Sequence, residues 1–89
     1  MRYFAAFLKM QDPVKNQDLR PQHLDFLTQT EKEGKIFARG RFEDGAGGLV
    51  IYQAESLEDA RKIAERDPYV TSGARSLELH EWGMKLSQR

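Results

Sequence analysis

The chain is organised around one stretch, Ala64-Glu65-Arg66-Asp67-Pro68-Tyr69-Val70-Thr71-Ser72-Gly73. Proline disfavours helical geometry in the residue before it, so we expect the helix that enters this stretch to end at Asp67. A carboxylate is then held at a helix end and is followed by an aromatic ring, two hydroxyls and a glycine that can turn the chain. The pattern also fits a plain helix stop, because Asp-Pro commonly opens a turn.

The residues on either side of this stretch predict a helix and a strand. Ser56-Leu57-Glu58-Asp59 resembles a capping box, although Asp is shorter than the usual Glu at the last position. The helix that follows has an apolar stripe of Leu57, Ala60, Ile63 and Ala64. Beyond the stretch, residues 76–82 alternate leucines with other side chains, which predicts a strand.

The N-terminal part of the chain predicts a strand, a loop and a helix. Residues 3–8 form a short, aromatic-rich run that is apolar on both faces, as is typical of a buried strand. Residues 10–20 are polar and predict a loop. Pro21 suits the first turn of a helix, where its missing N–H costs nothing, and Gly34 suits the end of one. We therefore expect a helix over residues 21–33.

The middle of the chain predicts a hairpin. Residues 36–42 alternate like a half-buried strand, and residues 49–54 form a strand that is apolar on both faces. The glycine-rich run 43–48 joins them. This run does not match a phosphate-binding loop, because it connects two strands and no lysine–hydroxyl pair follows it.

The resulting order, βαββαβ, predicts an α+β fold with a ferredoxin-like antiparallel sheet in strand order 4-1-3-2 and both helices on one face. In that topology the first and third strands are central, and these are the two strands that are apolar on both faces. Two helices cover only one face of the sheet, and the apolar residues on the other face need a cover. We expect a second copy to supply it, as a homodimer that forms a dimeric α+β barrel and that could assemble further.

Composition narrows the classes of protein to consider. The 89 residues predict one domain, 1–89, with 14 basic and 14 acidic side chains and no cysteine. Disulfides and thiolate metal sites are excluded, and two histidines without tight spacing give no reason to expect a metal. Zero formal net charge argues against a nucleic-acid or membrane-surface partner. No apolar run approaches the roughly 20 residues that cross a bilayer, so we expect a cytoplasmic protein.

Chain direction brings two titratable side chains to one edge of the predicted sheet. If the first strand runs upward, the first helix starts at the top edge of the sheet and the second helix ends there. His23 lies at that start and Asp67 at that end. A carboxylate beside an imidazole fixes which nitrogen carries the proton and makes the other nitrogen a better proton acceptor. We therefore predict an acid–base pair. The alternative is that His23 packs at the core boundary and that Asp67 hydrogen-bonds the turn after it.

The same edge collects basic and aromatic side chains. Arg20, Arg41 and Arg75 could face it and hold an anionic group, although such charges usually form only a solvated surface. Tyr69 lies in the turn that follows Asp67. We expect Arg20, Arg41 and Tyr69 to contact a small-molecule ligand.

Four pieces of the sequence, taken together, resemble the YCII-related family of small bacterial proteins, and the similarity covers nearly the whole chain. They are Tyr3-Phe4, Arg20-Pro21-Gln22-His23-Leu24, the glycine-rich approach to Leu49-Val50-Ile51, and Ser56-Leu57-Glu58-Asp59-Ala60 leading to Asp67-Pro68-Tyr69-Val70 with Gly73. The resemblance implies a dimeric α+β barrel and a site in which His23 matches the family histidine and Asp67 the family aspartate. It also implies that Ser72 and Gly73 line that site.

Two functions from different classes follow from the residues and the resemblance. The first is a cofactor-free acid–base enzyme that acts on a small aromatic or anionic molecule. The family includes a dehydrochlorinase of a chlorinated hydroxyquinol, and the fold is shared with muconolactone isomerases and cofactor-free monooxygenases, which implies lyase-like or isomerase-like chemistry. The second is a non-catalytic dimeric module that binds a small molecule. The family often has Gly-Pro at the end of the second strand, where this chain has Gly40-Arg41. The resemblance therefore does not identify the substrate of this chain.

An RNA-binding domain shares the βαββαβ order and is a third reading. It requires paired aromatics within a basic motif on the third strand. The residues Gly48-Leu49-Val50-Ile51-Tyr52 do not supply that motif.

Overall fold

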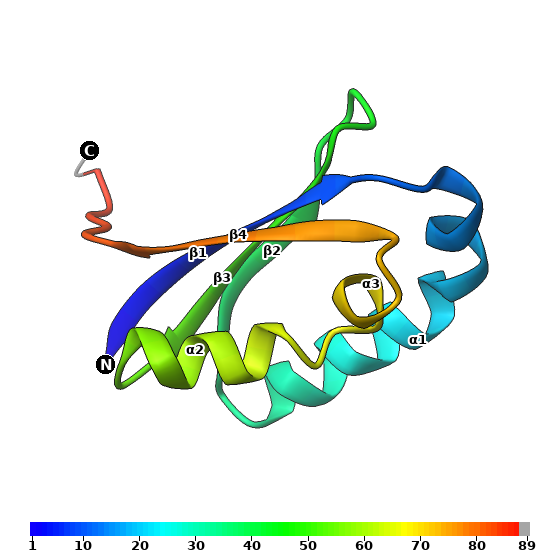
Figure 1. Ribbon diagram of the computed structural model, residues 1–89. Helices are drawn as coiled ribbons and strands as arrows, with labels where there is room; N and C mark the ends of the chain where they lie inside the picture. The colour runs from blue at the N-terminus through cyan, green and yellow to red at the C-terminus, as the bar shows by residue number, and fades with distance from the viewer. Residues whose placement is uncertain (88–89) are drawn as a thin grey trace.

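The computed structural model describes residues 1–87, which form four strands and three helices (Figure 1). In chain order these are β1 (Arg2–Met10), α1 (Pro13–Lys32), β2 (Ile36–Arg41), β3 (Gly47–Ala54), α2 (Leu57–Ala64), α3 (Pro68–Thr71) and β4 (Arg75–Trp82). The strands differ from the predicted ones only by one or two residues at their ends. Residues 88 and 89, the end of the predicted domain, lie outside the described residues.

The four strands form one antiparallel sheet in the order β2-β3-β1-β4, which confirms the predicted order 4-1-3-2. β1 and β3 are central, with Ala5 opposite Ile51. All three helices lie on one face of the sheet, and α3 sits between α1 and β4 (Figure 1). The chain therefore has the predicted ferredoxin-like α+β architecture.

The core lies between the sheet and the helices. Alternate residues of the central strands point to the helices and are almost fully buried, among them Phe4, Leu8 and Tyr52. The apolar stripe of α2 packs onto them through Ala60 and Ile63. Burial of apolar surface is the main stabilising contribution here, at roughly 25 cal/mol per Å².

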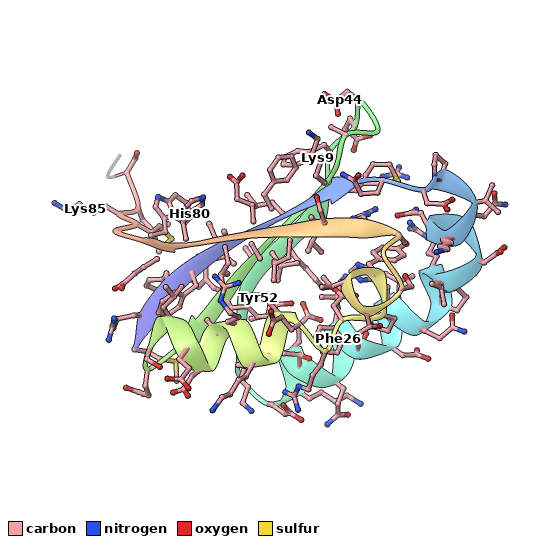
Figure 2. The ribbon with its side chains drawn as sticks, in the orientation of Figure 1. Lys9, Phe26, Asp44, Tyr52, His80 and Lys85 are labelled. Atoms are coloured by element: carbon pink, nitrogen blue, oxygen red, sulfur yellow. The ribbon has the colours of Figure 1, made fainter. Side chains whose placement is uncertain are left out.

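The opposite face of the sheet is aromatic, and none of the helices within residues 1–87 covers it. Tyr3 and Phe37 meet edge to face with ring centroids 5.1 Å apart, and Phe7 and Phe42 do the same at 5.6 Å. Trp82 lies at the rim, 45 % exposed. Figure 2 shows His80 on this side and Tyr52 on the helix side. We call this surface the open face.

The first helix is longer than predicted, and the predicted loop over residues 10–20 is wrong. α1 begins at Pro13, and its N-cap Asp12 accepts hydrogen bonds from the backbone N–H groups of Val14 and Lys15. Pro21 lies inside the helix instead of in its first turn. A proline in a helix interior removes one backbone hydrogen bond, and α1 changes direction over its N-terminal half (Figure 1).

The second helix ends earlier than predicted. α2 stops at Ala64, not at Asp67, and a further one-turn helix, α3, begins at Pro68. Asp67 is the N-cap of α3 and accepts a hydrogen bond from the Tyr69 N–H at 2.9 Å. The carboxylate therefore lies at the end of a helix where negative charge is favourable, not at a C-terminus. Gly73, with φ of +79°, turns the chain toward β4.

Candidate active site

His23 and Asp67 form a buried, hydrogen-bonded pair. His23 lies on the buried side of α1, in a row with Leu27 and Thr30, and its side chain is 8 % exposed. Its Nδ1 lies 2.8 Å from Asp67 Oδ1 and 3.0 Å from Oδ2. The sequence-based prediction that the fold brings these two side chains together is confirmed, although His23 lies well inside its helix and not at its start.

The carboxylate of Asp67 determines which nitrogen of the His23 imidazole carries the proton. Asp67 is fully buried, and an ionised carboxylate only accepts hydrogen bonds, so Nδ1 of His23 donates the N–H to it. Nε2 is then the nitrogen that is unprotonated in the neutral ring. Nε2 makes no hydrogen bond within residues 1–87, so it is available to a bound molecule.

The ring of Tyr69 holds the imidazole in place. It stacks on His23 with centroids 3.9 Å apart and planes 18° from parallel. The guanidinium carbon of Arg75 lies over the same ring, 4.3 Å from its centroid. Because the imidazole already occupies one face of the ring, Arg75 lies over the other. Tyr69 thus lies between the imidazole of His23 and the guanidinium of Arg75 and packs against both.

A cavity of about 250 Å³ opens beside this cluster, between α1 and the helix-facing side of β2 and β3. Its apolar wall consists of the side chains of Leu8, Leu24, Leu27 and Val50. Its polar wall consists of His23, Tyr69, Arg20, Arg39, Arg41 and Arg75. A mostly apolar cavity with a few converging polar groups is the usual form of a small-molecule site.

The four arginines of the cavity differ in how their charge is balanced. Arg39 donates two hydrogen bonds to Glu31, at 2.9 and 3.1 Å, which raises the pKa of Arg39 and lowers that of Glu31. Within residues 1–87 the carboxylate paired with Arg41 is that of the exposed Glu43, at 4.0 Å. Burial lowers the pKa of the Arg75 guanidinium, as does the charge of Arg20, while Asp67 opposes this effect. The cavity is therefore electropositive.

The structure brings most of the predicted site residues together. Arg20, His23, Arg41 and Tyr69 line the cavity, and Asp67 lies behind His23.

Ser72 and Gly73 do not line this cavity. Ser72 Oγ instead accepts a hydrogen bond from the Ala74 N–H at the end of α3. That these two residues contact a ligand stays a prediction.

The sequence-based prediction grouped Arg75 with Arg20 and Arg41 as cations that could hold an anionic group, but it did not include Arg75 among the residues expected to contact a ligand. Arg75 lies in the cavity wall. Arg75 shares the helix-facing row of β4 with Leu77 and Leu79, and a basic residue in line with two leucines was the available signal. The sequence gives no indication that apolar residues of α1 and β3 also form the wall of a cavity.

Two buried tyrosine hydroxyls, those of Tyr52 and Tyr69, have no hydrogen-bond partner within residues 1–87. Burial, reinforced by the charge of Asp67, raises the pKa of the Tyr52 hydroxyl. Tyr52 is therefore neutral wherever the protein is folded at ordinary pH, and it adds no charge near the His23–Asp67 pair.

Within residues 1–87 no group of three histidine or acidic side chains is arranged so that it could hold a metal ion. None of the helices in that range combines the length and the apolarity needed to cross a bilayer.

Comparison with known proteins gives the family. The model of the YCII-related domain matches residues 1–83. The chain belongs to the YCII-related family. It is 35 % identical over 83 residues to the uncharacterised protein YjpA of Bacillus subtilis, covering 93 % of this chain and 98 % of YjpA. It is also 36 % identical over 69 residues to the protein YciI of Escherichia coli O6:H1, covering 66 % of this chain and 70 % of YciI.

A solved structure gives the same fold. 5-chloro-2-hydroxyhydroquinone dehydrochlorinase (TftG) from Burkholderia phenoliruptrix AC1100, in complex with 2,5-dihydroxybenzoquinone, superposes with a TM-score of 0.77 and 21 % identity, covering 93 % of this chain and 95 % of TftG. At this identity the likeness shows the fold alone. The YCII-related chain thus shares its architecture with a protein that holds a small planar molecule.

Proposed function

We propose that the chain is a cofactor-free acid–base enzyme that acts on a small planar molecule bound in the cavity beside His23. One observation carries this proposal: a fully buried carboxylate orients an imidazole that lines the cavity wall. An unpaired histidine would serve core packing equally well, whereas the pairing supplies a fixed tautomer. Proton transfer by a positioned histidine typically contributes 10²–10⁴-fold to a rate.

The chemistry assigns each residue a step. Nε2 of His23 takes a proton from the bound molecule, and the electron pair left behind either remains as an enolate or expels a leaving group such as a halide. Asp67 holds the Nδ1–H and stabilises the imidazolium that forms. Arg20, Arg41 and Tyr69 contact the molecule. Returning the proton to another carbon gives isomerase-like chemistry, and loss of a leaving group gives lyase-like chemistry.

The relative of known structure supports the class of molecule. TftG is a dehydrochlorinase of a chlorinated hydroxyhydroquinone and holds 2,5-dihydroxybenzoquinone. Both compounds are planar, oxygen-rich rings, and the leucine and arginine walls of this cavity suit such a ring. We extend this class of molecule, not the individual substrate, to the YCII-related chain.

We also propose that the chain works as a homodimer that joins two open faces. Three observations support this assembly: the helices lie on the other side of the sheet, the open face carries the aromatic pairs Tyr3–Phe37 and Phe7–Phe42, and Trp82 stands exposed at its rim. A contiguous apolar surface of this kind usually marks an interaction site.

The test is conversion of small molecules by the wild-type protein and two variants. Wild type, His23→Ala and Asp67→Asn are each incubated with 5-chloro-2-hydroxyhydroquinone and, separately, with a bacterial metabolite extract. Mass spectrometry follows both reactions, and chloride release is measured in the first. We expect at least one compound to be converted by the wild type and conversion to fall at least 100-fold in both variants.

Two results would contradict the proposal. Equal conversion by His23→Ala would show that the imidazole is not the acid–base group. Retention of a compound without any conversion by the wild type would instead support the alternative function, a non-catalytic module that binds a small molecule. The nearly complete burial of the His23 side chain is the observation that favours this alternative.

A further inference from the structure

Arg75 is a buried guanidinium without a carboxylate partner. It is the first residue of β4 and is 7 % exposed. Its Nε donates to Asn16 Oδ1 at 2.7 Å, and its guanidinium carbon lies over the Tyr69 ring. Within residues 1–87 no carboxylate oxygen lies within 4.0 Å of it, and its two terminal nitrogens make no hydrogen bond. Arg75 therefore has unused donors beside the cavity that it lines.

A structural role does not explain this arrangement. Removing a charged group from water is expensive, and buried charges in proteins are normally paired with an opposite charge. Arg39 in the same cavity follows that rule through its two hydrogen bonds to Glu31. Arg75 does not follow it, because Asp67, the acidic side chain that acts on it electrostatically, is engaged by His23 and Tyr69.

The sheet is shaped to admit the guanidinium. Gly48 on β3 lies beneath it, and a Cβ atom at that position would be 2.9 Å from Arg75 Nη1 and 2.8 Å from the carbonyl oxygen of Gly40. Any side chain larger than hydrogen would therefore push Arg75 away from the cavity floor. Arg20 and Arg41 line the same cavity and add positive charge around it.

We propose that Arg75 is the anion anchor of the site and that the ligand is a planar oxyanion, a carboxylate or an enolate-type oxygen on a ring. The two terminal nitrogens of the guanidinium donate hydrogen bonds to the anionic oxygen atoms, because a planar guanidinium can bind two such oxygens side by side. Arg75 and His23 lie over the two faces of Tyr69 and both line the cavity, so a ring anchored on Arg75 lies in the same cavity as the imidazole of His23. The anchor serves the proton-transfer function proposed above, and it determines which molecules enter.

Benzoate and benzamide are suitable probes, because they share size and shape and only benzoate is charged. Each is titrated into wild type, Arg75→Gln, Arg75→Lys, His23→Ala and the control Arg61→Gln, with backbone amide NMR shifts as the readout. Arg61→Gln removes the same charge from the exposed side of α2.

We expect the wild type and Arg61→Gln to bind benzoate at least tenfold more tightly than benzamide. Arg75→Gln should lose that preference while it still binds benzamide. Arg75→Lys should keep the charge but bind benzoate several-fold more weakly, because its ammonium lacks the planar fork.

Several outcomes would overturn the anchor. The first is that the wild type does not bind benzoate. The second is that Arg75→Gln still prefers benzoate to benzamide. If Arg75→Gln does not fold, the corresponding outcome is that Arg75→Lys binds benzoate as tightly as the wild type. His23→Ala separates the two proposals. If this variant keeps the benzoate preference but also keeps full conversion of substrate, the anchor stands and the acid–base function fails.

Discussion

At the scale of single residues, one oxygen of Asp67 both caps a helix and orients the imidazole of His23. Oδ1 accepts the Tyr69 N–H, which starts α3, and it also accepts the Nδ1–H of His23. The cap places Tyr69 against His23, and the carboxylate fixes the tautomer. The order and orientation of the whole site therefore depend on one fully buried side chain.

Substitution of Asp67 should separate these two contributions. Asp67→Ala removes the cap and leaves the buried Nδ1–H without an acceptor, so we expect the free energy of unfolding to fall by about 3 kcal/mol. Asp67→Asn keeps an oxygen acceptor and should lose only about 1 kcal/mol. Urea unfolding followed by circular dichroism measures both, and equal losses in the two variants would contradict the double role.

The raised pKa of Tyr52 predicts how the stability of the protein depends on pH in alkaline solution. Its pKa is raised in the folded protein, so between the unfolded value of 10.0 and the higher folded value the folded state holds a proton that the unfolded state has lost. The neutral hydroxyl therefore makes its full contribution to the free energy of unfolding below pH 10.0, and this contribution is lost as the pH rises toward the pKa of the folded state.

Tyr52→Phe removes both this titration and an unpartnered buried hydroxyl. We expect the variant to be more stable at neutral pH by about 1 kcal/mol. It should also lose less stability than the wild type above pH 10.0. Urea midpoints measured across this range check both effects, and identical alkaline slopes for the two proteins would contradict the burial of Tyr52.

At the scale of elements, α1 and α3 were the hardest to predict. Two prolines, Pro13 and Pro21, each fit the first turn of a helix, and the polar residues between them show little apolar periodicity. Pattern reasoning therefore placed the start of α1 too late. The turn after Asp67 was read as irregular, because four residues are too few to display any period. Tertiary packing against the sheet decides both cases.

The N-cap of α1 provides a test of the corrected boundary. Asp12→Ala removes the acceptor of the Val14 and Lys15 N–H groups and should lower the free energy of unfolding by about 1 kcal/mol. Asp18→Ala is the matched control, since Asp18 is exposed within the same helix and caps nothing. If the helix began at Pro21 instead, the two variants would be equally stable.

At the scale of the whole molecule, topology was the most predictable property. The order βαββαβ predicted that β1 and β3 are central, their apolar residues on both faces agreed with it, and the structure confirms it. The same reasoning brought His23 and Asp67 together despite two wrong helix ends, because the direction of each helix was right. It could not reveal how far Arg75 reaches across the sheet toward Gly48, since strand alternation gives the face of a side chain but not its extent.

The dimer proposed above predicts how the open face responds to an added charge. Phe7→Glu puts a carboxylate among the aromatic side chains there, next to Phe42, and should convert a dimer to a monomer, as light scattering after size exclusion would show. Lys62→Glu on the exposed side of α2 is the control and should remain dimeric. A monomeric wild type, or a dimeric Phe7→Glu, would contradict a dimer joined through this face.

The protonation of His23, observed by ¹⁵N NMR of its two ring nitrogens as a function of pH, tests most directly whether the Asp67 carboxylate prepares this imidazole for proton transfer. We expect the neutral ring to carry its proton on Nδ1, Nε2 to shift when benzoate binds, and Asp67→Asn to disturb the tautomer. A neutral ring protonated on Nε2, or an Nε2 signal indifferent to benzoate, would contradict it.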